Sequence, residues 1–354
     1  MNVRHILSTL AGEVRQYKLP AVLTPVFVVL EVLMEVLIPF VIADLIDKGV
    51  EMGNYAVVAE DGVILIILAL LALLFGIIAG KTSADASAGF AKNLRRAVFT
   101  NVQKFSFANI DKYSPPSLIT RMTTDITNIQ NSFMMMIRVA IRSPVMFLAS
   151  FIMVLIIKPE MALIFAAVVP ILGIGVGFLT VKTFPIFERV FKKYDSLNAV
   201  VRENIRGIRV VKSFVRESFE KKKFKTASAD IYTEFVTAEK LMALMSPLMQ
   251  FCVYLCIIMI SLVGGQMIVF GDFTKGELIS VISYTMQILM SFMMVAMVIV
   301  MITMARASAI RITEVLDEVP TVTNPENPVT DVADGSVSFE NVSFSYQKDM
   351  PVLS

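Results

Sequence analysis

The sequence is poor in the residues from which proteins build most metal and catalytic centres. Its 354 residues include one histidine, two cysteines and no tryptophan. His5 lies near the N-terminus without a set of ligand-type neighbours, and we assign it no role. Cys252 and Cys256 lie one helical turn apart in an apolar segment, where inert buried thiols are a better interpretation than a metal or redox pair. The sequence therefore predicts no metal site and no catalytic residue within this chain.

Charge is also scarce, which argues against a soluble domain. Only 18% of the residues are charged and 56% are hydrophobic, with a mean hydropathy of +0.72, whereas soluble globular domains are about 25% charged. A helix that crosses a membrane needs about 20 mainly apolar residues. Six segments meet this requirement, at residues 19–42, 63–81, 132–157, 161–181, 241–268 and 278–304. The expected fold is an all-α membrane protein with six transmembrane helices.

The N-terminus lacks the apolar core of a cleavable signal peptide, because residues 1–18 are amphipathic and charged. We expect this segment to form a short helix that lies at the membrane interface before the first transmembrane helix.

The basic residues are distributed unevenly between the two sides of the membrane. Most lysines and arginines fall in the termini and in two long connections, at residues 82–131 and 182–240. The three short connections carry one basic residue each, namely Lys48, Lys158 and Lys275. By the positive-inside rule, both termini and the long connections are expected in the cytoplasm.

The long connections are expected to be helical. Residues 84–105 and 187–214 hold apolar residues at helical spacing with charges between them, and long unstructured loops are uncommon. The second to fifth transmembrane helices are therefore expected to continue far into the cytoplasm, each pair joined by a short connecting element. Pro115 and Pro116 cannot lie inside a helix and mark the first such turn.

Four segments, in the order of the chain, resemble those of one transporter family. They lie at residues 119–125, 203–214, 307–317 and 337–346. Each is weak alone, but their order on six transmembrane helices makes the chain similar to ABC exporters of the type IV fold. The resemblance implies a transmembrane domain with long cytoplasmic helical extensions and coupling helices. It also implies a β-strand stub at residues 337–346, the first strand of a nucleotide-binding domain.

The resemblance also implies roles for single residues. In the two coupling helices it points to Ile110, Tyr113, Ser117, Arg206, Gly207, Arg209, Val211, Lys212 and Phe214. A short helix across the tips of two long helices would be a handle on which a moving cytoplasmic domain can push. The alternative for residues 209–214 is an ordinary amphipathic surface helix. Tyr346 corresponds to the aromatic residue that stacks on the adenine of ATP in this family, so ATP and Mg²⁺ are the implied cofactors.

The expected domain division follows these segments. It places an interfacial helix at residues 1–18, the transmembrane domain at 19–316, a linker at 317–335 and the start of a nucleotide-binding domain at 336–354. We expect the ATPase machinery only in a longer, full-length form of the chain.

The sequence Gly80-Lys81-Thr82 is not the end of a phosphate-binding loop. The pattern requires an earlier glycine at position 75, which is Phe75, and the nearest one is Gly76. Gly76 and Gly80 are better explained as a small-residue packing face between transmembrane helices.

Charged residues within the membrane are the next signal. Glu31 and Glu35 lie one turn apart on the first transmembrane helix, and Arg138 and Arg142 lie one turn apart on the third. Charges in the membrane usually pair or line a wet cavity. Glu31 and Arg142 lie at similar depth, so we expect either an ion pair between them or a polar patch on a substrate cavity.

The sixth transmembrane helix carries a stripe of methionines at spacings of three and four. The residues proposed to line the cavity are Met286, Met290, Met293, Met297 and Met301. Methionine can adapt to varied apolar shapes, and in the resembled family this helix lines the translocation cavity. A helix-packing or lipid-facing stripe is the alternative.

The predicted function is that of the transmembrane subunit of an ATP-driven exporter in a bacterial inner or plasma membrane. It would act as a homodimer or heterodimer with a second half-transporter, moving a small amphiphilic drug, lipid or peptide outward by alternating access, with no nucleic acid involved. One alternative is a truncated, non-transporting or regulatory membrane partner. Another is a secondary transporter driven by an ion gradient, for which we find no convincing inverted repeat.

Overall fold

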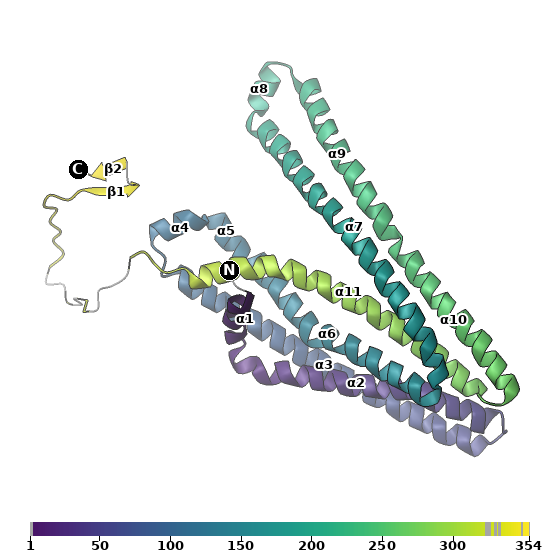
Figure 1. Ribbon diagram of the computed structural model, residues 1–354. Helices are drawn as coiled ribbons and strands as arrows, with labels where there is room; N and C mark the ends of the chain where they lie inside the picture. Colours follow the sequence, from purple (N-terminus) through teal and green to yellow (C-terminus); the bar gives the residue numbers. More distant parts are fainter. Residues whose placement is uncertain (1–2, 323–326, 329–330, 332–333, 348–349, 354) are drawn as a thin grey trace. The chain divides into compact units, whose positions relative to one another are not determined.

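Six helical segments long and apolar enough to cross a membrane dominate the described part of the chain (Figure 1). The computed structural model describes residues 3–322, 327–328, 331, 334–347 and 350–353. The six segments are Arg15–Val50, Tyr55–Val102, Pro115–Ile157, Pro159–Arg206, Glu217–Phe270 and Lys275–Asp317. The expected all-α architecture with six transmembrane helices is confirmed.

The chain begins with helix α1, Val3–Gly12, and a single 3₁₀ turn at Arg15–Tyr17. One face of α1 is buried through Ile6 and Leu10, whereas Leu7, beside that face, is 58% exposed. This division between faces is what an amphipathic helix requires. Helix α2, Lys18–Asp44, follows and passes into a π-helical turn at Leu45–Val50.

The long helices extend well beyond the thickness of a membrane. Helices α3, Tyr55–Val102, and α7, Pro159–Arg206, have 48 residues each. At 1.5 Å per residue such a helix is about 72 Å long, against a hydrocarbon thickness of about 30 Å. The other long helices are α6, Ile126–Ile157, α9, Glu217–Ala243, α10, Met245–Phe270, and α11, Lys275–Asp317. The predicted helical extensions are therefore present.

Short helices join the long ones. Between α3 and α6 lie α4, Phe107–Tyr113, α5, Pro115–Thr120, and a π-helical turn at Arg121–Asp125. Pro115 occupies the first turn of α5, where a proline removes no helical hydrogen bond. Between α7 and α9 lies α8, Ile208–Ser213, which crosses the end of their hairpin (Figure 1). Each predicted connecting element is thus a short helix or a pair of short helices.

The predicted strand at residues 337–346 is shorter than expected. Strand β1 covers Phe344–Gln347 and pairs antiparallel with β2, Met350–Leu353. Residues 337–343 are described but form no strand. Alternation of apolar and polar residues predicts a strand only where a partner strand satisfies its backbone hydrogen bonds, and no described segment pairs with residues 337–343.

The chain divides into two compact units. The first comprises Met1–Met34, Leu70–Val145 and Phe292–Ser354, and the second comprises Glu35–Ala69 and Met146–Ser291. In the first unit, buried side chains of α1, α3, α5, α6 and α11 form one core. Its members include Ile6, Leu10, Phe90, Leu94, Leu118, Ile126, Ile312 and Val315.

In the second unit α7 packs along α9 and α10. Cys252 and Cys256 are free thiols in α10, and both are fully buried as predicted. The start of α11 is capped by Asp47, whose carboxylate accepts hydrogen bonds from the hydroxyl of Thr274 at 2.5 Å and the backbone N–H of Gly276 at 2.8 Å. A carboxylate at a helix N-terminus satisfies otherwise unpaired donors.

Candidate functional site

The first predicted coupling element begins with a capped helix. Ser106 precedes α4, and its hydroxyl accepts a hydrogen bond from the backbone N–H of Asn109 at 3.5 Å. In return, the side-chain oxygen of Asn109 accepts from the backbone N–H of Ser106 at 3.2 Å. This reciprocal capping box fixes the start of α4. Asn109 is only 2% exposed, so its side-chain NH₂ group and the free lone pair of its oxygen must find hydrogen-bond partners within the protein.

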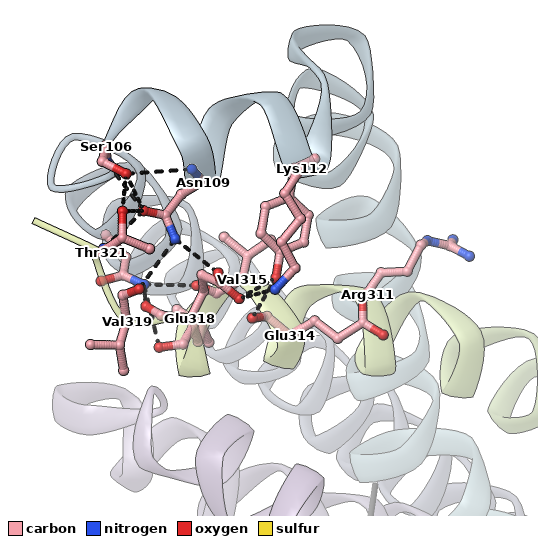
Figure 2. A network of polar contacts seen from close by, with 12 residues as sticks. Ser106, Asn109, Lys112, Arg311, Glu314, Val315, Glu318, Val319 and Thr321 are labelled. Carbon is pink, nitrogen blue, oxygen red and sulfur yellow. Dashed lines mark hydrogen bonds and ion pairs between the residues drawn. The ribbon is translucent and has the colours of Figure 1, made fainter. Parts of the chain in front are cut away.

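These partners lie in the segment that follows α11 (Figure 2). The amide of Asn109 donates to a carboxylate oxygen of Glu318 at 2.8 Å and to the backbone carbonyl of Val319 at 3.2 Å. Its side-chain oxygen also accepts from the backbone N–H of Thr321 at 3.1 Å. The hydroxyls of Ser106 and Thr321 are hydrogen-bonded as well. We call residues 318–321 the docked segment.

Glu318 is the ionic centre of this contact. Its carboxylate accepts from Lys112 at 2.7 Å and from the phenol of Tyr113 at 2.8 Å, in addition to Asn109. Chiefly because of the Lys112 hydrogen bond, and then those of Tyr113 and Asn109, the pKa of Glu318 falls to about 2. Burial, followed by the negative Glu318, raises the pKa of Tyr113. Glu318 is therefore ionised and Tyr113 protonated near neutral pH.

A shallow hollow of about 420 Å³ lies beside Glu318. It is lined by Lys112, Tyr113, Glu314, Asp317 and Glu318. Each acidic side chain there has a basic partner. A carboxylate oxygen of Glu314 lies 3.1 Å from a guanidinium nitrogen of Arg121, and one of Asp317 lies 2.7 Å from Nε2 of His5. His5, to which no role was assigned from the sequence, thus joins the N-terminal helix to the end of α11. Among the described residues no cluster of histidine, cysteine or acidic side chains could hold a metal ion.

The end of α11 is held by two further side chains. Asn101 of α3 donates to the carbonyls of Val315 at 2.7 Å and Glu318 at 3.1 Å, which are among the groups that a helix C-terminus leaves unpaired. Asp125, before α6, accepts from Ser308 at 2.8 Å and from the Nε of Arg311 at 2.8 Å. The carboxylate of Asp125 is 1% exposed and therefore depends on these donors.

The second predicted coupling element is α8, which lies across the tips of α7 and α9. Ion pairs hold the two long helices together below it, including Lys223 with Glu203 at 2.6 Å and Arg189 with Glu234 at 3.1 Å. A groove of about 490 Å³ lies beneath α8. The lining of this groove is mainly apolar and includes Val200, Val201, Ile205, Ile208, Val211 and Phe224.

The predicted coupling residues fall into two groups. Ile110 and Tyr113 pack against the core of their own unit, and Ser117 is half-buried. Phe107 and Ile119 are the large exposed apolar side chains of α4 and α5. On the second element, Gly207 and Val211 are half-buried. The exposed ones are Arg206, Arg209, Lys212 and Phe214. Phe214 is 74% exposed, so the apolar tip of α8 projects away from its own hairpin.

The structure confirms the predicted ion pair within the membrane. A guanidinium nitrogen of Arg142 lies 2.5 Å from a carboxylate oxygen of Glu31. Glu35 and Arg138 are half-buried. Gly76 faces the carboxyl group of Glu31, so this glycine makes room for a charged side chain as well as for helix packing.

Most of the methionine stripe of α11 is not buried in the described structure. Met286, Met290, Met293 and Met297 are exposed, and Met301 is half-buried. Tyr346 lies in β1, but its side chain is outside the part that the structure describes, and its nucleotide-binding role stays a prediction.

Comparison with known families gives a match over most of the chain. Residues 22–307 match the profile of the ABC transporter transmembrane region. This range includes all six apolar helical segments in whole or in large part, together with α4, α5 and α8.

Similar proteins occur in bacteria. An uncharacterized ABC transporter ATP-binding protein of Bacillus subtilis is 28% identical over 332 residues, covering 94% of this chain and 58% of that protein. One of Mycobacterium tuberculosis is 30% identical over 351 residues, covering 98% of this chain and 60% of the relative. A fatty acid ABC transporter ATP-binding/permease protein of the same species is 28% identical over 260 residues, or 73% of this chain and 41% of the relative. The chain thus spans less than two thirds of the length of these relatives.

Proposed function

This chain belongs to the ABC transporter transmembrane family, and on that premise we propose that it is the transmembrane subunit of an ATP-driven exporter working by alternating access. The observation that carries the proposal is the position of α8 across the end of the α7–α9 hairpin, with Phe214 exposed at its tip. A helix fixed at the end of two long helices can pass an applied displacement along them into the membrane. The exposed apolar tip would seat in a groove of the nucleotide-binding domain.

The first coupling element would meet that domain through other residues than Ile110 and Tyr113, which the family resemblance implies. Ile110 and Tyr113 are occupied by contacts within their own unit, whereas Phe107 is 80% and Ile119 is 63% exposed. We therefore assign docking at α4 and α5 to Phe107 and Ile119, and a supporting role to Ile110 and Tyr113.

ATP and Mg²⁺ would act in a nucleotide-binding domain of the full-length protein. The relatives are named ATP-binding proteins and are longer than this chain, which supports the proposal. Tyr346 would stack on adenine. Tyr346→Ala in the full-length protein should weaken ATP binding by about 1–3 kcal/mol, the usual contribution of an aromatic side chain that stacks on a base. Equal ATP affinities in a direct binding titration would contradict this role.

Orientation and assembly follow the family and the charge distribution. Both termini, α4, α5 and α8 would lie in the cytoplasm of a bacterial inner or plasma membrane, since most basic residues fall on that side. Two such chains, identical or different, would form the transporter. The family assignment argues against a carrier driven by an ion gradient.

The cargo would be a small amphiphile. The exposed methionines of α11 offer an adaptable apolar surface, and Glu31 with Arg142 provides charge within the membrane. One relative is named a fatty acid transporter, which supports a lipid-like cargo. We keep drug-like amphiphiles and peptides within the same class.

The test is the ATPase activity of the full-length protein in lipid vesicles, with and without amphiphilic cargo. Phe214→Ala should leave ATP affinity unchanged and abolish cargo stimulation, because the tip of α8 would lose its hold on the moving domain. The matched control is Phe191→Ala on α7, which removes the same side chain from a site that is 65% exposed but distant from α8. If Phe214→Ala retains both stimulation and transport, α8 is only a surface helix. A full-length protein that binds ATP but never transports would favour a regulatory partner.

A further inference from the structure

The docked segment and α4 complete each other's hydrogen bonds. The side-chain oxygen of Asn109 serves the capping box through Ser106 and the docked segment through Thr321. The amide of the same side chain donates only to the docked segment among the described residues, at Glu318 and Val319. One side chain therefore joins the start of the first coupling helix to the segment that leaves the last transmembrane helix.

The same region is connected onward to α11 itself. Asn101 holds the carbonyls at the end of α11, and Asp125 holds Arg311 one to two turns earlier. Figure 2 shows that Ser106, Asn109 and Lys112 face Glu318, Val319 and Thr321 across this junction. A displacement of α4 cannot leave α11 behind unless these polar contacts break.

These contacts are also of the kind that can open and close. Each intramolecular hydrogen bond replaces one to water, so its net contribution is small, although bonds to a charged group such as Glu318 contribute more. Asn109 and the backbone groups of the docked segment would regain water if the segment left. The docked state is thus favoured by several hydrogen bonds, each with a small net free energy, rather than by burial of a large apolar surface.

Resting on the proposed function, we propose that Asn109 is a positioning residue that holds the docked segment on the first coupling helix. It makes the coupling helix and the connection to the nucleotide-binding domain act on α11 as one body. When the hydrogen bonds of Asn109 to the docked segment are formed, a displacement of α4 by the nucleotide-binding domain also displaces α11, which carries the methionine stripe. When these bonds break, the nucleotide-binding domain can move without moving α11, and ATP turnover is separated from cargo.

Asn109→Asp is the most informative change, because it keeps the shape and the hydrogen bonds that the side-chain oxygen accepts from Ser106 and Thr321. It removes the two donated bonds and places a second carboxylate against Glu318. The ratio of docked to released segment should fall by about tenfold or more, since hydrogen bonds to charged groups are worth that much. The double variant Asn109→Asp with Glu318→Gln reverses donor and acceptor, because the new amide can donate to the new carboxylate, and should restore docking.

Docking is measured by spin labels at Asp111→Cys and Val322→Cys, two exposed positions on α4 and just beyond the docked segment, in a background without Cys252 and Cys256. Pulsed electron paramagnetic resonance should give one short distance for the parent and a broad, longer distribution for Asn109→Asp. Asn204→Asp is the matched control. Asn204 donates to Glu220 at 3.1 Å in the α7–α9 hairpin, so the same chemistry is lost without contact to the docked segment.

Function is measured as the ratio of cargo-stimulated to basal ATPase activity in the full-length protein. A positioning role predicts that Asn109→Asp keeps basal activity and loses stimulation, and that the double variant recovers it. If the segment is released but stimulation persists, or if Asn109→Asp leaves the distance unchanged, the proposal is wrong. Should Asn109→Asp fail to fold, the double variant and Thr321→Val decide the question. Thr321→Val removes only the hydroxyl contacts to Ser106 and Asn109 and leaves the backbone hydrogen bond of Thr321 in place. A parent protein without any cargo-stimulated activity would instead overturn the proposed function, and the distances would still test docking.

Discussion

Arg142 of α6 and Glu31 of α2 form an ion pair of 2.5 Å inside the membrane-spanning part of the chain. The side chain of Glu31 is 12% exposed and that of Arg142 is 32% exposed, so the carboxylate is the more deeply buried partner. One of its oxygens bonds to the guanidinium, whereas the other is buried without a hydrogen-bond partner in the described structure. The pair therefore joins two helices and leaves Glu31 dependent on Arg142.

Breaking this pair should destabilise the protein in a non-additive way. Removal of one member of a buried pair costs about 3–5 kcal/mol because the other charge is left in a poor solvent. Glu31→Ala and Arg142→Ala should each lower the midpoint of thermal unfolding in detergent, and the double variant should recover part of the loss. The double-mutant cycle measures this coupling directly.

Arg138 provides the control for that cycle. It lies one turn from Arg142 on the same helix, and its guanidinium approaches Gly80 rather than Glu31. Glu31→Ala combined with Arg138→Ala should give additive losses. Additive losses in the Glu31 and Arg142 cycle would show that the two charges do not stabilise each other. A change in cargo preference at unchanged stability would favour the role in lining a cavity.

Much of this fold could be predicted because long apolar runs and helical spacing are local signals. The six transmembrane helices, their extensions and the short helices at 107–120 and 208–213 follow from such patterns. The ion pair between Glu31 and Arg142 was also accessible, since helical rise converts residue counts into depth. The absence of a strand at 337–343 was not predictable, because a strand depends on a partner strand and periodicity alone does not show whether one is present.

The contacts of Asn109 with the docked segment could not be predicted from local sequence patterns. Ser106 and Asn109 have the spacing of a capping box, which could have marked the start of α4. Nothing local indicates that the same asparagine binds Glu318 and Thr321, because these contacts form only when α11 packs against α3 and α4. For the same reason His5 looked isolated in the sequence although it contacts Asp317.

Gly76 should tolerate alanine less well than Gly80 does. Alanine favours a helix over glycine by about 1 kcal/mol. A Cβ at position 76 would lie 3.1 Å from a carboxylate oxygen of Glu31, which Arg142 already holds, whereas a Cβ at position 80 would lie 3.8 Å from its nearest neighbour. Gly80→Ala should therefore be neutral or stabilising. In Gly76→Ala the higher helix propensity of alanine should be offset, because crowding of a packed site costs about 1–3 kcal/mol.

Thermal unfolding of the two glycine variants in the same detergent checks this difference. Adding Glu31→Ala to Gly76→Ala removes the crowded carboxyl group and should restore the benefit of alanine. Equal midpoints for Gly76→Ala and Gly80→Ala would show that the Glu31 carboxyl moves aside freely.

The contact between α4 and the docked segment should weaken in acid. The pKa of Glu318 is lowered to about 2 from an ordinary value of 4.5, chiefly by Lys112. A lowered pKa in the folded protein means that the ionised form stabilises the contact fully above pH 4.5. This stabilisation is lost as the pH falls from there through about 2. The measurement is the α4-to-segment distance between spin labels across this pH range.

Glu318→Gln should remove most of this pH dependence, because no charge remains to be titrated at the centre of the contact. Glu340→Gln is the control, since Glu340 is exposed and its carboxylate contacts only the nearby Ser338 hydroxyl among the described residues. A release profile that is the same in Glu318→Gln and the parent would place the acid-sensitive group elsewhere.

Asp125 and Arg311 should respond unequally to removal of their partner. The Asp125 carboxylate is 1% exposed and the Arg311 side chain is 44% exposed, and the two are joined through two hydrogen bonds. In Arg311→Ala, Asp125 keeps the hydrogen bond from Ser308 but loses its main counter-charge in a buried site, which should cost about 3 kcal/mol or more. In Asp125→Ala, Arg311 can turn to water, and the loss should be nearer 1 kcal/mol. Chemical unfolding of the two variants measures both losses, and Arg311→Lys, which keeps the charge but not the paired geometry, should fall between them. Equal losses, or a greater loss for Asp125→Ala, would show that the carboxylate does not depend on Arg311 for its stability in the folded chain.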